Sequence, residues 1–213
     1  MEKELKKRIL SSIIMIPLSV FFIIKGSIFF ILFITILFFI ACLEWSKMTK
    51  RNELKIFGIF FLLLSFYSVY LVRDKGLFEF LMILIICITT DIGGYVFGKI
   101  FKGPKLIKIS PNKTYSGVVG GFLLSIVVAY LFNLKYDNYF PGNQNFLMDM
   151  FFIMTVFLIS SISQIGDLII SYFKRASNLK NTGNLFPGHG GLLDRIDGMI
   201  FVFPFVFIIS RLF

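Results

Sequence analysis

Apolar residues gather in seven long blocks along the chain, separated by shorter polar stretches rich in Lys, Gly and Asn. A helix that crosses a bilayer needs about 20 largely apolar residues. The blocks are close to this length, and they lack the alternation of period 2 that is typical of half-buried strands. The pattern therefore predicts seven membrane-spanning helices, over residues 9–24, 27–43, 56–72, 77–98, 117–134, 146–169 and 196–213.

The composition agrees with an integral membrane protein. Hydrophobic residues make up 57% of the 213 and charged residues only 16%, whereas an ordinary soluble domain has about 25% charged residues. These values exclude a disordered chain and argue against a water-soluble globule. No repeat or long polar linker divides the sequence, so we expect an all-α, polytopic membrane bundle that forms a single domain over residues 1–213.

The positive residues give the orientation of this bundle. Of the 22 Lys and Arg, 17 fall in the N-terminal segment and in every second connection between blocks, and five fall in the remaining connections and at the C-terminus. Because cytoplasmic loops carry the excess of Lys and Arg, the N-terminus and the connections 99–116 and 170–195 are predicted to be cytoplasmic. A re-entrant segment near residues 160–190 would change the number of spans.

The connection 99–116 offers groups that suit an anion. The run Ser110-Pro111-Asn112-Lys113-Thr114 is typical of a turn followed by a helix start. Its polar side chains, Asn112, Lys113 and Thr114, together with the free N–H groups of a helix N-terminus, can bind a phosphate. Taken alone this signal is weak, because lysine-rich cytoplasmic loops are common.

The end of the fourth block, just before this connection, holds a carboxylate and three glycines. Asp91 lies beside the membrane, where an ionisable residue is a functional candidate by default; the alternative is a carboxylate that caps the helix or meets interfacial water. Gly93, Gly94 and Gly98 favour close packing against another helix.

The connection 170–195 and its flanks carry more chemistry. Asp167, Ser171 and Lys174 are four and three residues apart, so on a helix they share one face. Asp194 and Asp197, three residues apart, share a face at the start of the next helix. These three carboxylates can therefore supply oxygen ligands, and such ligands favour a hard cation, above all Mg²⁺.

Between these two groups lies a segment too rich in glycine for a helix, Phe186-Pro187-Gly188-His189-Gly190-Gly191. Its backbone can approach a ligand closely, as phosphate-binding loops do. Four cations surround it in the sequence, Lys174, Arg175, Lys180 and Arg195. An ion-paired cytoplasmic loop without catalytic function is the alternative, but it would not explain the density of glycines.

At these residues the sequence resembles the phosphatidate cytidylyltransferases, also called CDP-diacylglycerol synthases. The resemblance rests on residues 164–198, which include Gln164-Ile165-Gly166-Asp167-Leu168, Ser171-Tyr172-Phe173-Lys174-Arg175, Lys180 and the run from Phe186 to Asp197, and it extends to residues 110–114. One position departs from the family pattern, because Asn181 stands where the family usually has Asp. This exchange weakens any metal-binding role for position 181.

The resemblance implies that CTP and phosphatidic acid react to give CDP-diacylglycerol and pyrophosphate in a multi-pass protein of the inner (plasma) membrane whose active site faces the cytoplasm. The expected partners are CTP, phosphatidic acid and membrane lipids, with no nucleic acid, and the expected cofactor is Mg²⁺. The sequence leaves open a second, monovalent cation and a homodimer.

Each candidate residue then receives a role. We expect the Mg²⁺ ligands to be Asp167, Asp194 and Asp197. The substrate-binding residues are expected to be Asn112, Lys113, Thr114, Ser171, Gly190 and Gly191. The catalytic group comprises Lys174, Arg175, Lys180, Arg195 and the single histidine, His189. We expect His189 to contact a phosphate or order the loop rather than to act as a base.

Two other functions fit part of the pattern. Carboxylates and glycine-interrupted helices also occur in transporters, but here the ionisable residues lie toward the cytoplasmic ends of the blocks and no inverted repeat is found. The CDP-alcohol phosphotransferases share the membrane setting and Mg²⁺, but only apolar residues follow Asp197-Gly198 where that family has further aspartates.

Overall fold

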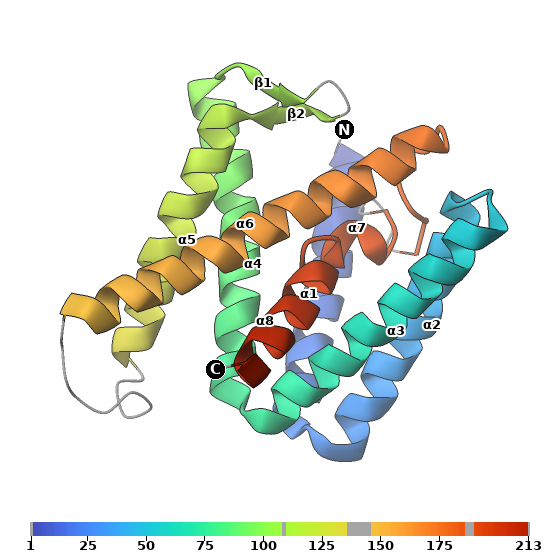
Figure 1. Cartoon of the computed structure of the whole chain (residues 1–213). Helices are drawn as coiled ribbons and strands as arrows, with labels where there is room; N and C mark the ends of the chain where they lie inside the picture. The colour runs from blue at the N-terminus through green and yellow to red at the C-terminus, as the bar shows by residue number, and fades with distance from the viewer. Residues whose placement is uncertain (1, 108–109, 136–145, 186–189, 213) are drawn as a thin grey trace.

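Helices form almost the whole of the computed structural model, which describes residues 2–107, 110–135, 146–185 and 190–212. Eight helices and one short hairpin follow each other along the chain (Figure 1). They are α1 (Glu2–Lys25), α2 (Ser27–Met48), α3 (Asn52–Lys75), α4 (Leu77–Phe101), β1 (Lys105–Ile107), β2 (Ser110–Thr114), α5 (Tyr115–Lys135), α6 (Phe146–Ala176), α7 (Leu193–Ile196) and α8 (Met199–Leu212).

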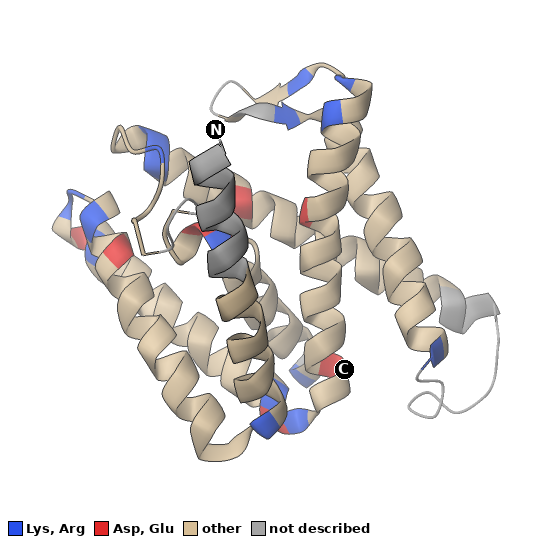
Figure 2. Cartoon of the chain, turned by 180° about the vertical axis from the view of Figure 1, so that it is seen from behind, with Lys and Arg blue, Asp and Glu red and all other residues tan. Residues whose placement is uncertain are grey.

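The seven predicted apolar blocks all coincide with helices, which confirms the predicted class of an all-α polytopic membrane bundle. Among the described residues, five helices, α2 to α6, are long and apolar enough to cross a membrane, and two shorter apolar helices cover Ile13–Lys25 and Met199–Arg211. Large apolar side chains such as Phe57, Phe60 and Phe151 are exposed on the outside of the bundle, as expected of surfaces that face lipid. Lys and Arg gather toward the ends of the long helices (Figure 2).

Glycines set the distance between α4 and α5. An added Cβ at Gly93 would lie 2.5 Å from the carbonyl oxygen of Gly120, and one at Gly117 would lie 2.6 Å from that of Gly94. The two backbones therefore touch, which is the arrangement that small residues permit between membrane helices. The glycines at the end of α4 were predicted to serve this packing, and the structure confirms it for Gly93.

Two local features differ from the sequence-based expectation. Residues 110–114 form strand β2, which pairs antiparallel with β1, rather than a turn; α5 then begins at Tyr115, close to the predicted helix start. The last predicted helix begins three residues later than expected, because α7 ends at Ile196 and α8 begins only at Met199. This break places Asp197 between two helices instead of within one.

Candidate active site

The C-terminal part of α6 faces α7, and the contact between them is polar. Asp167, Ser171 and Lys174 lie on one helix, as their spacing predicts, and the Ser171 hydroxyl donates to Asp167 Oδ1 at 3.2 Å. Three residues further along α6, Lys174 Nζ donates to Asp194 Oδ1 of α7 at 2.7 Å. Both side chains of this ion pair are largely buried, with 12% and 10% of their surface exposed.

The second oxygen of Asp194 receives hydrogen bonds from two loops. The backbone amides of Thr182 and Gly191 donate to Oδ2 at 2.8 and 3.0 Å, and the Thr182 hydroxyl lies 3.1 Å from the same atom. Burial alone would raise the pKa of Asp194, but the bonds from Lys174 and from the two amides outweigh it and lower this pKa below its ordinary value. Asp194 therefore stays ionised and ties α6 to both loops.

Asp197, one turn further, has the opposite electrostatic environment. It is buried and accepts a hydrogen bond from the amide of Gly198 at 2.9 Å. Burial, followed by the nearby carboxyl groups of Asp167 and Asp91, raises the pKa of Asp197 well above its ordinary value. The structure thus brings Asp197, Asp167 and Asp91 together, and Lys174 is close enough to Asp197 to offset part of this effect.

The hairpin before α5 contributes a second lysine. Lys113 of β2 forms an ion pair with Asp167 Oδ2. The side chain of Thr114 has a structural contact, because its Oγ1 accepts the amide of Gly117 at 3.1 Å and so caps the first turn of α5. Of the anion-binding group expected here, Lys113 therefore reaches the carboxylates of α6 directly.

Gly190 shows why glycine is needed in the loop before α7. Its φ of +89° is a conformation that other residues rarely adopt, and an added Cβ would lie 2.6 Å from Asp194 Oδ2. The expected close approach of this loop backbone is thus observed, although the group that it approaches here is Asp194.

Several predicted residues lie away from this cluster or outside the described part of the chain. Arg175 is exposed, and its Nη1 donates to the carbonyl of Leu179 at 3.2 Å, at the end of its own helix. Lys180 is exposed in the following loop. His189 and the side chain of Asn112 are outside the described residues.

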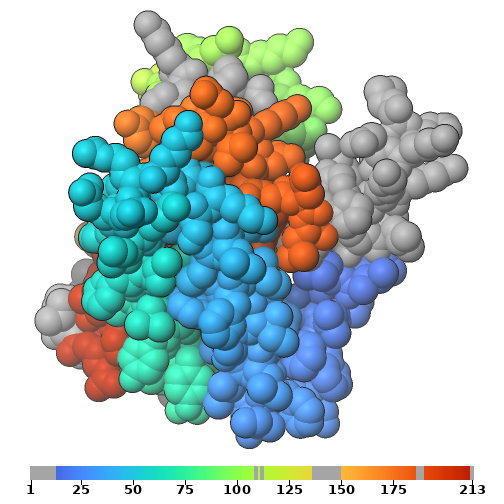
Figure 3. Space-filling model, turned by 90° about the vertical axis from the view of Figure 1, so that its right-hand side faces the viewer, coloured from blue at the N-terminus to red at the C-terminus, as the bar shows by residue number. Residues whose placement is uncertain are grey.

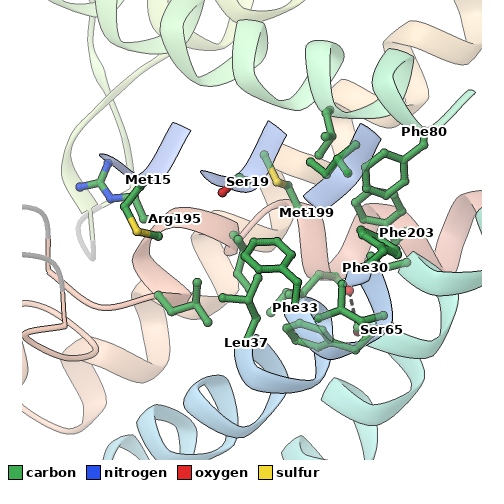
Figure 4. A pocket seen from close by; sticks show the side chains of 18 of the residues that line it. Met15, Ser19, Phe30, Phe33, Leu37, Ser65, Phe80, Arg195, Met199 and Phe203 are labelled. Carbon is green, nitrogen blue, oxygen red and sulfur yellow. Dashed lines mark hydrogen bonds between the residues drawn. The ribbon is translucent and has the colours of Figure 1, made fainter. Parts of the chain in front are cut away.

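An apolar cavity of about 500 Å³ lies on the other side of α7 and α8. Its lining comes from α1, α2, α3, α4, α7 and α8, and Figure 4 shows Arg195 at one end and Phe80 and Phe203 at the other. Arg195 is the one charged residue among the described residues of this lining, and it also interacts electrostatically with Asp91. The short helix α7 therefore presents Asp194 to the polar cluster and Arg195 to the cavity.

Glu44 is a polar residue of this region that the sequence analysis missed. It lies in α2, is 6% exposed, and accepts hydrogen bonds from the amides of Leu192 and Leu193 at 2.8 and 2.9 Å. Its position directly after the apolar block 27–43 was the available signal, because an ionisable residue beside a membrane span is a functional candidate.

The carboxylates of this cluster are ligands of the chemical type that a hard divalent cation prefers. Carboxylate oxygens from Asp167, Asp194 and Asp197 come from two facing segments, and two lysines now offset their charge, Lys113 at Asp167 and Lys174 at Asp194. Within the described residues, no three His, Cys, Asp or Glu side chains stand as a ready-made metal-binding group. Mg²⁺ commonly takes only one or two protein carboxylates and completes its shell with substrate phosphates and water.

Sequence comparisons show which proteins this chain is similar to. Residues 54–213 match a family described as the cytidylyltransferase family. The chain is 36% identical to a phosphatidate cytidylyltransferase of Rickettsia felis, over 96% of this chain and 92% of the relative. The corresponding protein of Rickettsia bellii is 33% identical over 100% and 93%, and that of Haemophilus influenzae is 40% identical over 61% of this chain and 44% of the relative.

The fold and the site define a multi-pass membrane enzyme whose charged cluster lies beside an apolar cavity. The chain belongs to the cytidylyltransferase family and is a nucleotidyltransferase related to the phosphatidate cytidylyltransferases. The resemblance seen in residues 164–198 is thereby confirmed, and the transporter and CDP-alcohol phosphotransferase alternatives are set aside.

Proposed function

We propose that this protein transfers the cytidylyl group of CTP to phosphatidic acid, giving CDP-diacylglycerol and pyrophosphate, in a Mg²⁺-dependent reaction at the cytoplasmic face of the inner membrane. The observation that carries this proposal is the Lys174–Asp194 pair, with Asp167 and Asp197 beside it and an Arg195-lined apolar cavity on the other face of α7. A lipid phosphate and a nucleotide triphosphate need such a junction of polar and apolar surfaces.

The reaction makes modest demands on acid–base chemistry. A phosphate monoester has a second pKa of about 6, so the attacking oxygen of phosphatidic acid is already largely deprotonated at neutral pH. This oxygen forms a bond to the α-phosphorus of CTP while the bond from that phosphorus to the bridging oxygen of pyrophosphate breaks. No strong base is required, and the main task is to hold two anionic reactants together.

The cations of the site carry out this task. Lys174 and Lys113 are held beside the carboxylates, where phosphate oxygens can exchange with Asp194 and Asp167 as their partners. We expect Arg195, which lines the apolar cavity, to bind the phosphate of the lipid. Mg²⁺, held by Asp167, Asp194 and Asp197, would supply the charge that stabilises the pentavalent phosphorus.

The apolar cavity suits an acyl chain of phosphatidic acid. Its charged end is Arg195, and its remaining described lining is apolar apart from Ser19 and Ser65. Leu37 lines the cavity, whereas its neighbour Ile36 is exposed on the outside of α2. We expect Leu37→Trp to raise the KM for phosphatidic acid several-fold without changing that for CTP, and Ile36→Trp to change neither.

The proposal is tested with the purified full-length protein in detergent micelles that contain phosphatidic acid. Addition of CTP and Mg²⁺ should release pyrophosphate and produce CDP-diacylglycerol, and EDTA should stop both. Asp194→Asn should abolish turnover, because an amide in place of the carboxylate cannot accept from Lys174 and from the two amides at once. Turnover in Asp194→Asn within a few-fold of the unchanged protein would show that the Asp194 carboxylate is not needed for the reaction.

A further inference from the structure

Glu44 reaches the site from outside the part of the chain that matches the family. It lies in the last two turns of α2, ten residues before the matched segment 54–213 begins. In the space-filling view, the segment that follows α6 lies directly against the upper part of α2 (Figure 3). The C-terminal end of α2 is therefore a wall of the site region.

The carboxylate of Glu44 binds both loops that surround Asp194. Oε1 accepts the amide of Leu192, and Oε2 accepts the amide of Leu193 at the start of α7. Oε2 also accepts the hydroxyl of Thr182, at 2.8 Å, from the loop that follows α6. The two loops that donate to Asp194 are thus the same two loops that donate to Glu44.

The fit around this carboxylate is tight. An added Cβ at Gly191 would lie 2.5 Å from both Glu44 oxygens, and one at Gly183 would lie 2.7 Å from Oε1. Neighbouring contacts fix the end of α2 in the same place: the Ser177 hydroxyl donates to the carbonyl of Met48, and the Trp45 ring packs against Phe173 of α6 at 4.9 Å. The close glycines and the contacts at the end of α2 therefore restrict the position of the Glu44 side chain.

The bonding pattern explains why a carboxylate stands here. Three donors point at its two oxygens, so an amide of the same shape would have to turn an NH₂ group toward an N–H or lose an acceptor. A buried carboxylate is costly unless it is fully hydrogen-bonded. At Glu44 the required hydrogen bonds come from the backbone at the start of α7 and from the Thr182 side chain.

We propose that Glu44 is a positioning residue for the active site. It acts through the start of α7 and through Thr182, and it holds Asp194 where Lys174 meets it. This inference rests on the proposed function for its kinetic readout, but the contacts themselves do not depend on the identity of the substrates.

The test compares Glu44→Gln, Glu44→Asp and a matched control in the full-length protein. The control is Ser160→Ala, which removes a buried bond from Thr90 of α4 to α6 away from the loops, at 2.8 Å. We expect Glu44→Gln to lower kcat about 10- to 100-fold, the range of one or two charge-assisted bonds, and to leave the KM for phosphatidic acid unchanged. Glu44→Asp keeps both acceptors and should recover part of the loss.

A double-variant cycle separates positioning from general destabilisation. Thr182→Val removes the hydroxyl that contacts Glu44 and Asp194, so its effect and that of Glu44→Gln should overlap, and the combined loss should be smaller than the product of the two single losses. Kcat within twofold of the unchanged protein in Glu44→Gln would overturn the proposal. So would a kcat loss in Ser160→Ala as large as that in Glu44→Gln at the same loss of thermal stability.

A readout without substrate keeps the two proposals distinct. Hydrogen exchange of the Leu192 and Leu193 amides should be at least about tenfold faster in Glu44→Gln than in the unchanged protein and in Ser160→Ala. If the unchanged protein shows no turnover with CTP and phosphatidic acid, the proposed function fails, and exchange alone decides whether Glu44 holds the loop. Unchanged exchange in Glu44→Gln would overturn the positioning role whatever the substrates are.

Discussion

Lys174 is the residue on which the polar cluster depends most directly. It donates to Asp194 and lies near Asp197, and its side chain is only 12% exposed. We expect Lys174→Ala to reduce turnover at least about 100-fold and to lower stability, because removing one partner leaves a buried carboxylate without its counter-charge.

Lys99 is a suitable control for Lys174, because it is an exposed lysine of α4 whose ammonium lies over the ring of Tyr95. Lys99→Ala should leave turnover and the unfolding midpoint nearly unchanged. Equal turnover in the two variants would show that the charge of Lys174 is not used.

Asp197 makes the stability of the protein depend on pH in a defined direction. Since its pKa is raised in the folded state, this group favours the folded protein fully below the ordinary carboxyl pKa of about 4. This contribution is lost as the pH rises through the raised pKa. In buffer with EDTA, Asp197→Asn should therefore unfold at a higher temperature than the unchanged protein at pH 7.

Well below the ordinary carboxyl pKa of about 4 the advantage of Asp197→Asn should vanish, because the carboxyl group is then protonated in both the folded and the unfolded protein. Thermal unfolding at several pH values measures this difference. A midpoint for Asp197→Asn that is lower than that of the unchanged protein at pH 7 would contradict the assigned environment.

Among the elements, the pair α4 and α5 gives the sharpest contrast between neighbouring residues. An added Cβ at Gly93 meets the Gly120 carbonyl at 2.5 Å, whereas one at Gly94 meets only the Gly117 carbonyl at 3.8 Å. Gly93→Ala should lower the free energy of unfolding by about 1–3 kcal/mol, because the helices must separate. Gly94→Ala should change it little, and thermal unfolding of both variants in detergent measures the difference.

Helix periodicity was sufficient to predict the row on α6 but insufficient for the elements around it. Asp167, Ser171 and Lys174 share a face because a helix has 3.6 residues per turn, and the structure confirms that face. The strand β2 was expected to be a turn, because its pairing with β1 depends on a partner several residues away. The break before α8 was also missed, although the polar Asp197 and the flexible Gly198 occupy it.

At the scale of the whole molecule, the side of the membrane that each loop faces can be tested directly. The predicted seven crossings with a cytoplasmic N-terminus would put Asn181 in the cytoplasm and Asp74 outside, and both residues are exposed. In a variant without Cys42 and Cys87, a cysteine at Asn181 should react with a membrane-impermeant reagent only after the cells are opened. A cysteine at Asp74 should react in intact cells, and the reverse result would overturn the orientation.

Much of the candidate site was predictable because its chemistry is concentrated in residues 164–198. The pairings inside it were not. Lys113 and Asp167 are far apart in the sequence, and so are Glu44 and Leu193. Such contacts depend on how the helices pack, and apolar blocks of similar composition carry little information about which helix lies beside which.

The length of α6 has a mechanical consequence. Its 31 residues span about 46 Å at 1.5 Å per residue, whereas the hydrocarbon layer of a bilayer is about 30 Å thick. A hydrophobic helix longer than this layer can be accommodated by tilting, and the tilt that it needs depends on the thickness of the surrounding lipid. Asp194 is linked to α2 because Glu44 accepts the backbone amide of the nearby Leu192, whereas Lys174 belongs to α6. We therefore expect bilayer thickness to alter the spacing of Lys174 and Asp194, and turnover measured in bilayers of different acyl length tests this.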